Sequence, residues 1–422
     1  MREFTDGSTA IVRGALDAGC TFFAGYPITP ASPILMQILR ELPKVGGVAI
    51  QAEDEIASIG MCIGATLAGS RAMTATSGPG ISLYSENIGL AIMGEVPLVL
   101  VDVQRLGPAT GGATTVGQGD VQFVRWGTGG GYPVIALAPS SVAECYSLTR
   151  RAFDLAERFR CPVFLLTDKE LDMTSVTVDT DAYEKPPVRA RAVLGGTGAS
   201  TVANAGRDTT ASSSASLSAA DAGSATPSES SNTSDAKTST ADSNSAAAIA
   251  NPPPYRYEPA DGVPPLAQYG GDVLVRFTGS THDERALITK APAKVAALNE
   301  HLRAKIEDHA DEIELVVRDL QPGARVLFVS YGITAGAMRE AVRRMRSSGR
   351  RVSAMTLHCL WPVPEGALLD ALEDVDVVVV AELNHGQYRR EIERLGPGVD
   401  VRGLHRVDGE LITPEQFVEI AR

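Results

Sequence analysis

Two short segments carry polar side chains whose types and spacing could orient a small ligand. Residues 25–32 read Gly-Tyr-Pro-Ile-Thr-Pro-Ala-Ser, and residues 51–60 read Gln-Ala-Glu-Asp-Glu-Ile-Ala-Ser-Ile-Gly. Two prolines restrict the backbone around Thr29, so we expect its hydroxyl to be held in place at the end of a strand. The three carboxylates at 53–55 open an apolar run, where such groups either cap a helix or face a ligand.

A third candidate is Arg105, which follows the segment 97–103, a run that is apolar except for Asp102. A guanidinium at the carboxyl end of a buried strand is costly to desolvate unless an anion meets it, and its fork suits a carboxylate. Arg105 is therefore a candidate for binding an anionic ligand. A structural ion pair with Glu95 or Asp102 is the alternative, and Asp120 could satisfy the same guanidinium.

The glycine-rich segment 74–80, Thr-Ala-Thr-Ser-Gly-Pro-Gly, would let the backbone approach a neighbouring group closely. It fits a tight packing turn as well as the wall of a cofactor site. Other familiar chemistries lack their motifs: there is no Walker Gly-Lys-Ser/Thr, no Gly-x-Gly-x-x-Gly after the first strand, and no hydrolase elbow around Ser77. The histidines have no metal-binding spacing, and His385, in a polar cluster at a strand end, is the one candidate functional histidine.

Length and composition limit the class of protein. With 422 residues, of which 44% are hydrophobic, the chain can form two or three packed domains. The net charge of −13 argues against a nucleic-acid binder. The five cysteines have no Cys-x-x-Cys spacing, so any iron–sulfur centre is expected on another chain. Because the apolar runs are too short to cross a membrane and the N-terminus does not read as a leader, we expect a cytoplasmic protein.

The elements that must position these residues follow an α/β pattern. Residues 1–185 alternate strand and helix signals with short Gly/Pro punctuation, which predicts a parallel sheet covered by helices. Strands are expected at 20–25, 48–51, 71–76, 97–103, 134–138 and 162–167, and helices at 33–42, 55–68 and 141–158. The run at 97–103 should be buried on both faces of the sheet.

The composition changes near residue 194 to Ser, Ala, Thr, Gly, Asn and Asp, which predicts a disordered insert until about residue 250. A Pro-rich stretch at 251–266 leads to an expected strand at 273–278 and a helix at 291–310. A second α/β unit follows, with strands at 325–330, 351–357 and 376–381 and helices at 334–348, 364–372 and 388–395. Its polar strand end, residues 382–387, lies where open α/β sheets present ligands or partners.

Taken together, these motifs resemble the alpha subunit of 2-oxoacid:ferredoxin oxidoreductases, most closely the 2-oxoglutarate type. The resemblance is carried by residues 26–30, 53–57, 74–80, 87–90, 103–105 and 118–120. It resumes from 321 to 395, where Glu-Leu-Asn-His-Gly-Gln at 382–387 is similar to the family's Glu-Met/Leu-Asn-x-Gly-Gln. Ala31 replaces a serine common in the motif, and the low-complexity insert has no recognised counterpart.

The resemblance implies a thiamine-diphosphate enzyme divided between chains. It assigns residues 1–190 to a pyrimidine-binding thiamine-diphosphate domain and 321–422 to a transketolase C-terminal-like α/β domain. Between them lie the low-complexity disordered insert with its Pro-rich linker, 191–265, and a connecting strand and helix, 266–320. The chain has no Gly-Asp-Gly and no cluster-binding cysteines, so Mg²⁺ and an iron–sulfur cluster are expected on a beta subunit.

The resemblance also implies residue roles at the cofactor. Glu55 matches the family glutamate that bonds the aminopyrimidine ring nitrogen, with Glu53 as the competing assignment two residues earlier. Tyr26, Pro27 and Ile28 belong to the motif that lies against the cofactor. A carboxylate held at that nitrogen favours its protonated form, which activates the opposite amino group as a base.

Thr29 and Arg105 match the family residues that hold the 2-oxoacid, the arginine through the substrate carboxylate. The implied reaction is oxidative decarboxylation of 2-oxoglutarate to an acyl-coenzyme A, with electrons passed to ferredoxin. One alternative keeps the family but changes the substrate to pyruvate or a branched-chain 2-oxoacid. Another, of a different class, is a non-catalytic nucleotide-binding or scaffold protein on the same fold.

Overall fold

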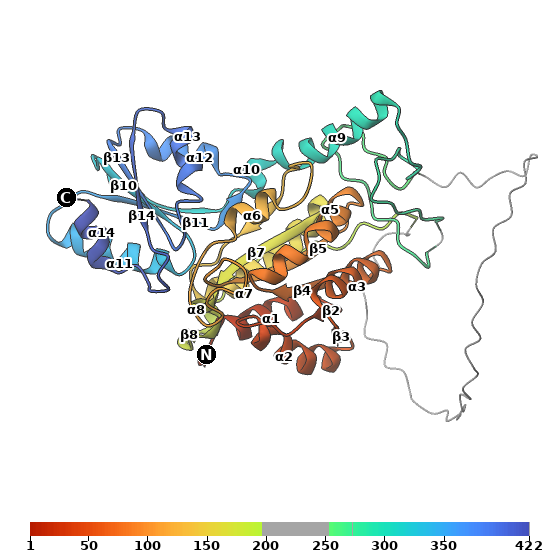
Figure 1. The fold of residues 1–422 in the computed structure, drawn as a ribbon, viewed down its shortest axis with the longest axis horizontal. Coiled ribbons are helices and arrows are strands. Elements are labelled where there is room, and N and C mark those ends of the chain that lie inside the picture. Colours follow the sequence, from red (N-terminus) through yellow and green to blue (C-terminus); the bar gives the residue numbers. More distant parts are fainter. Residues whose placement is uncertain (196–252, 272, 422) are drawn as a thin grey trace, which may run out of the picture. The chain divides into compact units, whose positions relative to one another are not determined.

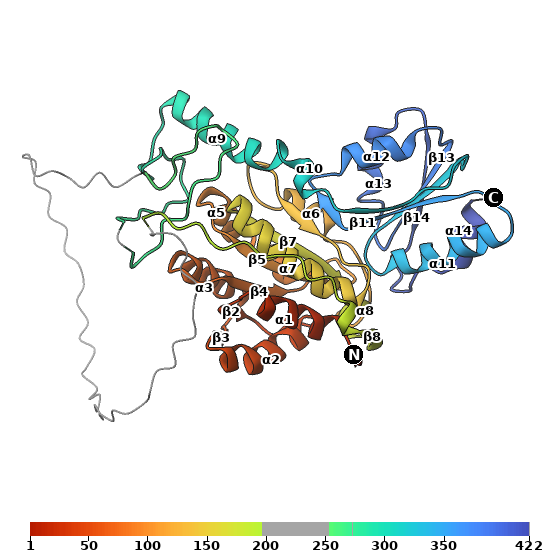
Figure 2. The same cartoon turned by 180° about the vertical axis from the view of Figure 1, so that it is seen from behind.

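The computed structural model describes residues 1–195, 253–271 and 273–421. The expected low-complexity insert lies almost wholly outside the described residues. None of the helices in the described ranges combines the length and the hydropathy that crossing a bilayer demands. Figures 1 and 2 show the arrangement of the elements from opposite sides.

The N-terminal part of the chain forms a seven-stranded, mostly parallel sheet. From one edge to the other its strands are β12 (Cys359–Trp361), β6 (Ile135–Leu137), β7 (Pro162–Asp168), β5 (Leu98–Gln104), β4 (Ala72–Thr76), β2 (Phe22–Gly25) and β3 (Val48–Gln51). Every residue of β5 is buried, as expected for a strand covered on both faces. The edge strand β12 comes from the C-terminal part of the chain and pairs antiparallel to β6.

Helices cover both faces of this sheet, which confirms the predicted α/β class (Figure 1). The helices packed on one face are α1 (Gly7–Asp17), α2 (Ser32–Glu41) and α7 (Val142–Phe159). Those on the other face are α3 (Glu55–Leu67), α4 (Pro79–Leu83) and α5 (Ser85–Met93). Alternate residues of β5 point into the two cores, Val99 and Val101 into the first and Leu98 and Leu100 into the second.

The C-terminal part forms a five-stranded sheet. Its order is β14 (Asp400–His405), β13 (Val377–Glu382), β10 (Val326–Ser330), β11 (Ser353–Leu357) and β9 (Val316–Asp319), with β9 antiparallel to the rest. The helices α11 (Thr334–Ser347) and α14 (Pro414–Ile420) cover one face, and α12 (Glu365–Leu372) and α13 (Arg389–Leu395) the other (Figure 2).

The remaining elements complete the described structure. They are the antiparallel pair β1 (Arg2–Thr5) and β8 (Val176–Asp179), the helices α6 (Val121–Trp126), α8 (Lys169–Met173), α9 (Pro292–Glu307) and α10 (Ala310–Ile313), and the 3-10 turns Leu42–Val45 and Thr180–Ala182. The helix expected at 291–310 is α9, which ends three residues earlier, at Glu307, and the short helix α10 follows it.

The strand expected at 273–278 is wrong, because the structure has irregular backbone there. Burial does alternate at its start, with Val273 buried and Leu274 exposed, as it would in a strand. Instead of joining a sheet, Phe277 packs against Gly94. Side-chain alternation alone does not make a strand when no neighbouring edge supplies backbone hydrogen bonds.

Candidate active site

The loop after β2 presents the Tyr-Pro-Ile-Thr-Pro motif at the carboxyl edge of the first sheet. Tyr26 and Pro27 are exposed, and Ile28 and Thr29 are half-buried. Thr29 lies in the loop beyond β2, which ends at Gly25, rather than at the strand end. The Ile28 carbonyl accepts a hydrogen bond from the backbone N–H at the start of α2, at 2.9 Å, so the loop is tied to that helix.

The three acidic residues at the start of α3 differ in burial and in hydrogen bonding. Asp54 is the N-cap, and its carboxylate accepts a hydrogen bond from the Ala57 N–H at 2.7 Å. Glu53 is exposed, whereas Glu55 is only 8% exposed. Capping therefore accounts for Asp54 but not for Glu55, whose carboxylate makes no hydrogen bond or ion pair within the described residues.

The turn 76–80 lies against Glu55. A Cβ added at Gly80 would lie 2.0 Å from the Thr76 Oγ1 and 3.1 Å from a Glu55 carboxylate oxygen, so only glycine fits there. The hydroxyls of Thr76 and Ser77 are buried and lack hydrogen-bond partners in the part of the chain that the structure describes. Unpartnered buried hydroxyls beside an unpaired carboxylate indicate a site built for a polar ligand.

The same turn also touches Arg105. A Cβ at Gly78, whose φ is +33°, would lie 3.6 Å from the Arg105 Cγ. Arg105 is 5% exposed, and its Nη1 donates a hydrogen bond to the Thr29 carbonyl at 2.5 Å. The structure therefore brings Thr29 and Arg105 together, and the turn 76–80 links them to Glu55.

The ion pair expected as an alternative for Arg105 does not form with Glu95. The Glu95 carboxylate instead contacts Lys305 at 2.9 Å and His301 at 2.8 Å. Within the described ranges Arg105 has no ion pair within 4.0 Å, and its Nε is buried without a hydrogen-bond partner. A buried guanidinium with a free N–H is poised for an anion that the chain itself does not provide.

Two carboxyl groups lie behind Arg105. Asp102, on β5, is fully buried, and Asp120 is tied to the end of the same strand by a hydrogen bond from its N–H to the Gln104 side chain at 3.2 Å. Burial, and then the neighbouring Asp120, raise the pKa of Asp102 well above its ordinary value. Burial raises the pKa of Asp120 to about 6, against the opposing effects of Asp102 and Arg105. The sequence showed both residues only as possible partners of Arg105, because strand spacing does not reveal that the two acids face each other.

The polar strand end at 382–387 holds the chain's own loop rather than a ligand. Gln118 accepts a hydrogen bond from the Leu383 N–H at 3.1 Å, and the Asn384 side chain donates to the Gln118 carbonyl at 2.7 Å. The Gln387 amide donates to the Gly119 carbonyl at 2.6 Å. His385, the candidate functional histidine, is exposed and makes none of these contacts. The motif thus fixes the loop that carries Asp120.

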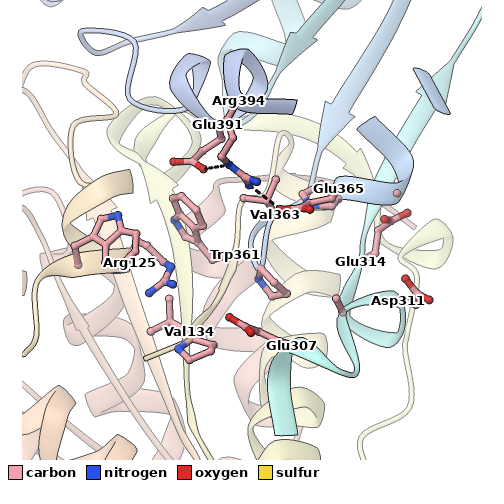
Figure 3. A pocket seen from close by; sticks show the side chains of 16 residues that line it. Arg125, Val134, Glu307, Asp311, Glu314, Trp361, Val363, Glu365, Glu391 and Arg394 are labelled. Carbon is pink, nitrogen blue, oxygen red and sulfur yellow. Dashed lines mark hydrogen bonds and ion pairs between the residues drawn. The ribbon is translucent and has the colours of Figure 1, made fainter. Parts of the chain in front are cut away.

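A pocket of about 720 Å³ is lined by none of the predicted site residues (Figure 3). Its walls come from α6, α10, the segment after β12, and α13, and Arg394 pairs there with Glu365 at 2.7 Å and Glu391 at 3.4 Å. The candidate active site is therefore the carboxyl edge of the first sheet and not this pocket.

Comparison with known proteins decides the family. A model described as pyruvate flavodoxin/ferredoxin oxidoreductase, thiamine diphosphate-binding, matches residues 13–203, and the core domain II model of pyruvate:ferredoxin oxidoreductase matches 324–417. The 2-oxoglutarate synthase subunit KorA of Methanocaldococcus jannaschii is 37% identical, over 98% of each chain. The chain belongs to the 2-oxoacid:ferredoxin oxidoreductase alpha-subunit family.

Other members of this family carry other substrate names. The ketoisovalerate oxidoreductase subunit VorB of Methanothermobacter thermautotrophicus is 30% identical over the whole of this chain and 97% of its own length. A solved 2-oxoglutarate:ferredoxin oxidoreductase of Magnetococcus marinus, with 2-oxoglutarate, coenzyme A and succinyl-CoA bound, superposes with a TM-score of 0.80 at 28% identity. It covers 100% of this chain, which spans 64% of that protein's chain.

Proposed function

We propose that this chain is the alpha subunit of an enzyme that oxidatively decarboxylates 2-oxoglutarate, forms an acyl-coenzyme A and passes electrons to ferredoxin, acting together with a beta subunit. The observation that carries the proposal is the largely buried Glu55, whose carboxylate forms no hydrogen bond within the described residues, joined through one glycine turn to the unpaired guanidinium of Arg105. The 2-oxoglutarate synthase relatives support this substrate over the branched-chain alternative, because their identity to the chain is higher.

The residues around the turn 76–80 fit the pyrimidine half of thiamine diphosphate. Glu55 would hold a proton shared with the pyrimidine ring nitrogen, and Gly80, where a side chain would collide with Thr76, lets the turn pack closely against Glu55. Tyr26, Pro27 and Ile28 would form the neighbouring wall from the loop after β2. When bound, thiamine diphosphate supplies the carbon nucleophile for the 2-oxo group and takes up the electrons left by decarboxylation.

Arg105 and Thr29 would hold the substrate. The guanidinium has an Nε–H without a partner beside the N–H of one terminal nitrogen, and this pair of donors suits bidentate contact with a carboxylate. The hydrogen bond from Nη1 to the Thr29 carbonyl fixes the direction in which the fork points. The Thr29 hydroxyl lies on the same loop and would contact the 2-oxo group. Binding both ends of the 2-oxoacid function would orient it for the reaction.

A beta subunit would complete the site. Beside Glu55, α3 exposes Ile56 at 52% and Met61 at 39%, and Leu83 follows on α4 at 47%. Exposed apolar side chains on the two helices next to the site support packing against a partner chain. We assign to that partner the diphosphate-bound Mg²⁺ and the iron–sulfur cluster. All five cysteines of this chain are buried, and burial raises the pKa of the Cys20 thiol to about 12, which disfavours the thiolate that a cluster needs.

We further propose that the chain is organised as 1–190, the pyrimidine-binding domain; 191–265, the insert and Pro-rich linker; 266–320, the connection; and 321–422, the transketolase C-terminal-like domain. The hydrogen bonds between Gln118 and residues 383–384 support a second role for the last domain, which is to hold the loop that carries Asp120.

The experiment that tests this function is ferredoxin reduction by the complex of the chain with its beta subunit. Coenzyme A and a panel of 2-oxoglutarate, pyruvate and 2-oxoisovalerate are supplied in turn. The proposal predicts the highest kcat/KM with 2-oxoglutarate. A preference for either other acid would assign the chain to another substrate, and turnover of none of them would leave the non-catalytic alternative.

A further inference from the structure

A buried cluster of three ionisable groups lies at the carboxyl end of β5, and its hydrogen bonding is incomplete if every group is charged. Both carboxyl oxygens of Asp102, one oxygen of Asp120 and the Nε of Arg105 are buried without a well-aligned partner among the described residues. Yet the two carboxyl groups are neighbours: the Asp120 N–H donates to the Gln104 side chain at 3.2 Å, which ties Asp120 to the end of the strand that carries Asp102, and each acid affects the pKa of the other. Two carboxylates cannot hydrogen-bond, because neither has a proton to donate.

One added proton removes this difficulty. If either acid is protonated, its O–H donates to the other acid, and the pair then holds a single negative charge between two carboxyl groups. The backbone N–H of Gly78 approaches Asp102 and stabilises the remaining charge. This arrangement also explains why Arg105 forms no ion pair within 4.0 Å although two acids lie nearby, because the pair satisfies itself.

We propose that Asp102 and Asp120 share one proton and that this pair is a positioning device for Arg105, which holds the guanidinium in place while leaving its charge available to the substrate carboxylate. The inference rests on the proposed function, because it takes Arg105 as the group that binds the 2-oxoacid. With one shared proton the cluster of three groups is neutral. Loss of that proton makes the cluster negative, which would repel an anionic substrate.

The charged neighbours of the pair are few, so its proton should control the local charge. Arg105 follows on the same strand end and lowers the pKa of both acids. Glu55 lies against the turn 76–80, beside Thr76 and Gly80. On the neighbouring strand, Asp168 is turned away, because its carboxylate accepts hydrogen bonds from the N–H groups of Ile333 and Leu171.

Steady-state kinetics of the complex with its beta subunit test this role. We expect the wild-type KM for 2-oxoglutarate to rise toward alkaline pH, by about tenfold for each pH unit beyond the loss of the shared proton, with kcat changing little. In Asp120→Asn the amide donates permanently to Asp102, so this alkaline rise should disappear. Asp120→Glu, which can still share a proton, should restore it.

Asp168→Asn is the matched control, since burial raises the pKa of Asp168 to about 6 as well, yet this acid faces α11. It should keep the wild-type dependence of KM on pH. An alkaline rise that persists in Asp120→Asn, or that Asp168→Asn abolishes, would overturn the proposal. A structural role alone would change the melting temperature and leave the pH profile of KM in place.

An infrared difference spectrum needs no turnover and separates this inference from the proposed function. Near neutral pH, wild type minus Asp120→Asn should show the carbonyl band of one protonated carboxylic acid. A missing band in an enzyme that turns over 2-oxoglutarate would refute the shared proton and leave the function intact. A band in a complex that turns over no 2-oxoacid would refute the function and leave the protonated pair.

Discussion

The buried carboxylate of Glu95 holds helix α9 against the first sheet, and breaking that contact should be costly. Glu95 is 0% exposed and Lys305, on α9, is 1% exposed, with 2.9 Å between the Lys305 Nζ and the Glu95 Oε2. Lys305→Met leaves the carboxylate with His301 as its single side-chain partner. Removing one partner of a buried ion pair costs about 3–5 kcal/mol of unfolding free energy.

A double variant separates the ion pair from the packing around it. Glu95→Gln with Lys305→Met removes both charges, and the new amide can donate to Nε2 of His301, whose Nδ1 donates to the Ala260 carbonyl. We therefore expect at least about 2 kcal/mol of the loss to be recovered. The matched control is Lys294→Met, on the same helix, whose ammonium is half exposed and pairs with Asp283 at 3.0 Å. It should cost less than about 1 kcal/mol.

Urea unfolding measures the loss, and amide hydrogen exchange across α9 shows whether this helix opens first. The reasoning would be refuted if Lys305→Met lost less than about 1 kcal/mol, the range of an exposed pair. It would also be refuted if the double variant were as unstable as the single one, because the cost would then come from lost packing rather than from an uncompensated charge.

Two further predictions concern single side chains. Lysine cannot make a bidentate contact with a carboxylate, so Arg105→Lys should raise KM for 2-oxoglutarate by about tenfold or more. The control Arg160→Lys, at a buried arginine, should leave KM unchanged. Equal KM values for Arg105→Lys and the wild type would remove Arg105 from the substrate site. Burial, helped by nearby Asp168, raises the pKa of Asp172 to about 7, so the folded state holds a proton that the unfolded state releases. The wild-type free energy of unfolding should therefore fall by up to about 4 kcal/mol as the pH rises from about 4 to 7. In Asp172→Asn this part of the fall should be missing from a plot of melting temperature against pH. Parallel plots for the wild type and the variant would contradict the prediction.

The sequence predicted the first sheet well where strands are buried and flanked by turn residues. The strand at 48–51 has the predicted bounds, and β5 lies within one residue of the expected 97–103. Such segments carry their signal locally, as an apolar run between Gly and Pro. The three-residue strand β12 has no such signal, because its partner β6 lies far away in the sequence and the pairing exists only in the folded chain.

The same holds for the site residues: features set by neighbours in the sequence were predicted, and contacts between distant segments were not. Spacing identified the acidic segment but left Glu53 and Glu55 open, because choosing between them requires knowing that Asp54 is the N-cap. The cluster at 382–387 read as a ligand-facing strand end, yet it binds the loop at 118–122. A contact between segments so far apart in the sequence cannot be predicted from the residues of either segment alone.

The most direct test of the central claim compares two neighbouring carboxylates in the purified complex with the beta subunit. The complex should contain thiamine diphosphate, Glu55→Gln should lower kcat for 2-oxoglutarate by about a hundredfold or more, and the exposed Glu53→Gln should retain wild-type turnover. A complex without thiamine, or equal turnover in the two variants, would contradict the assignment of Glu55 as the group that faces the cofactor.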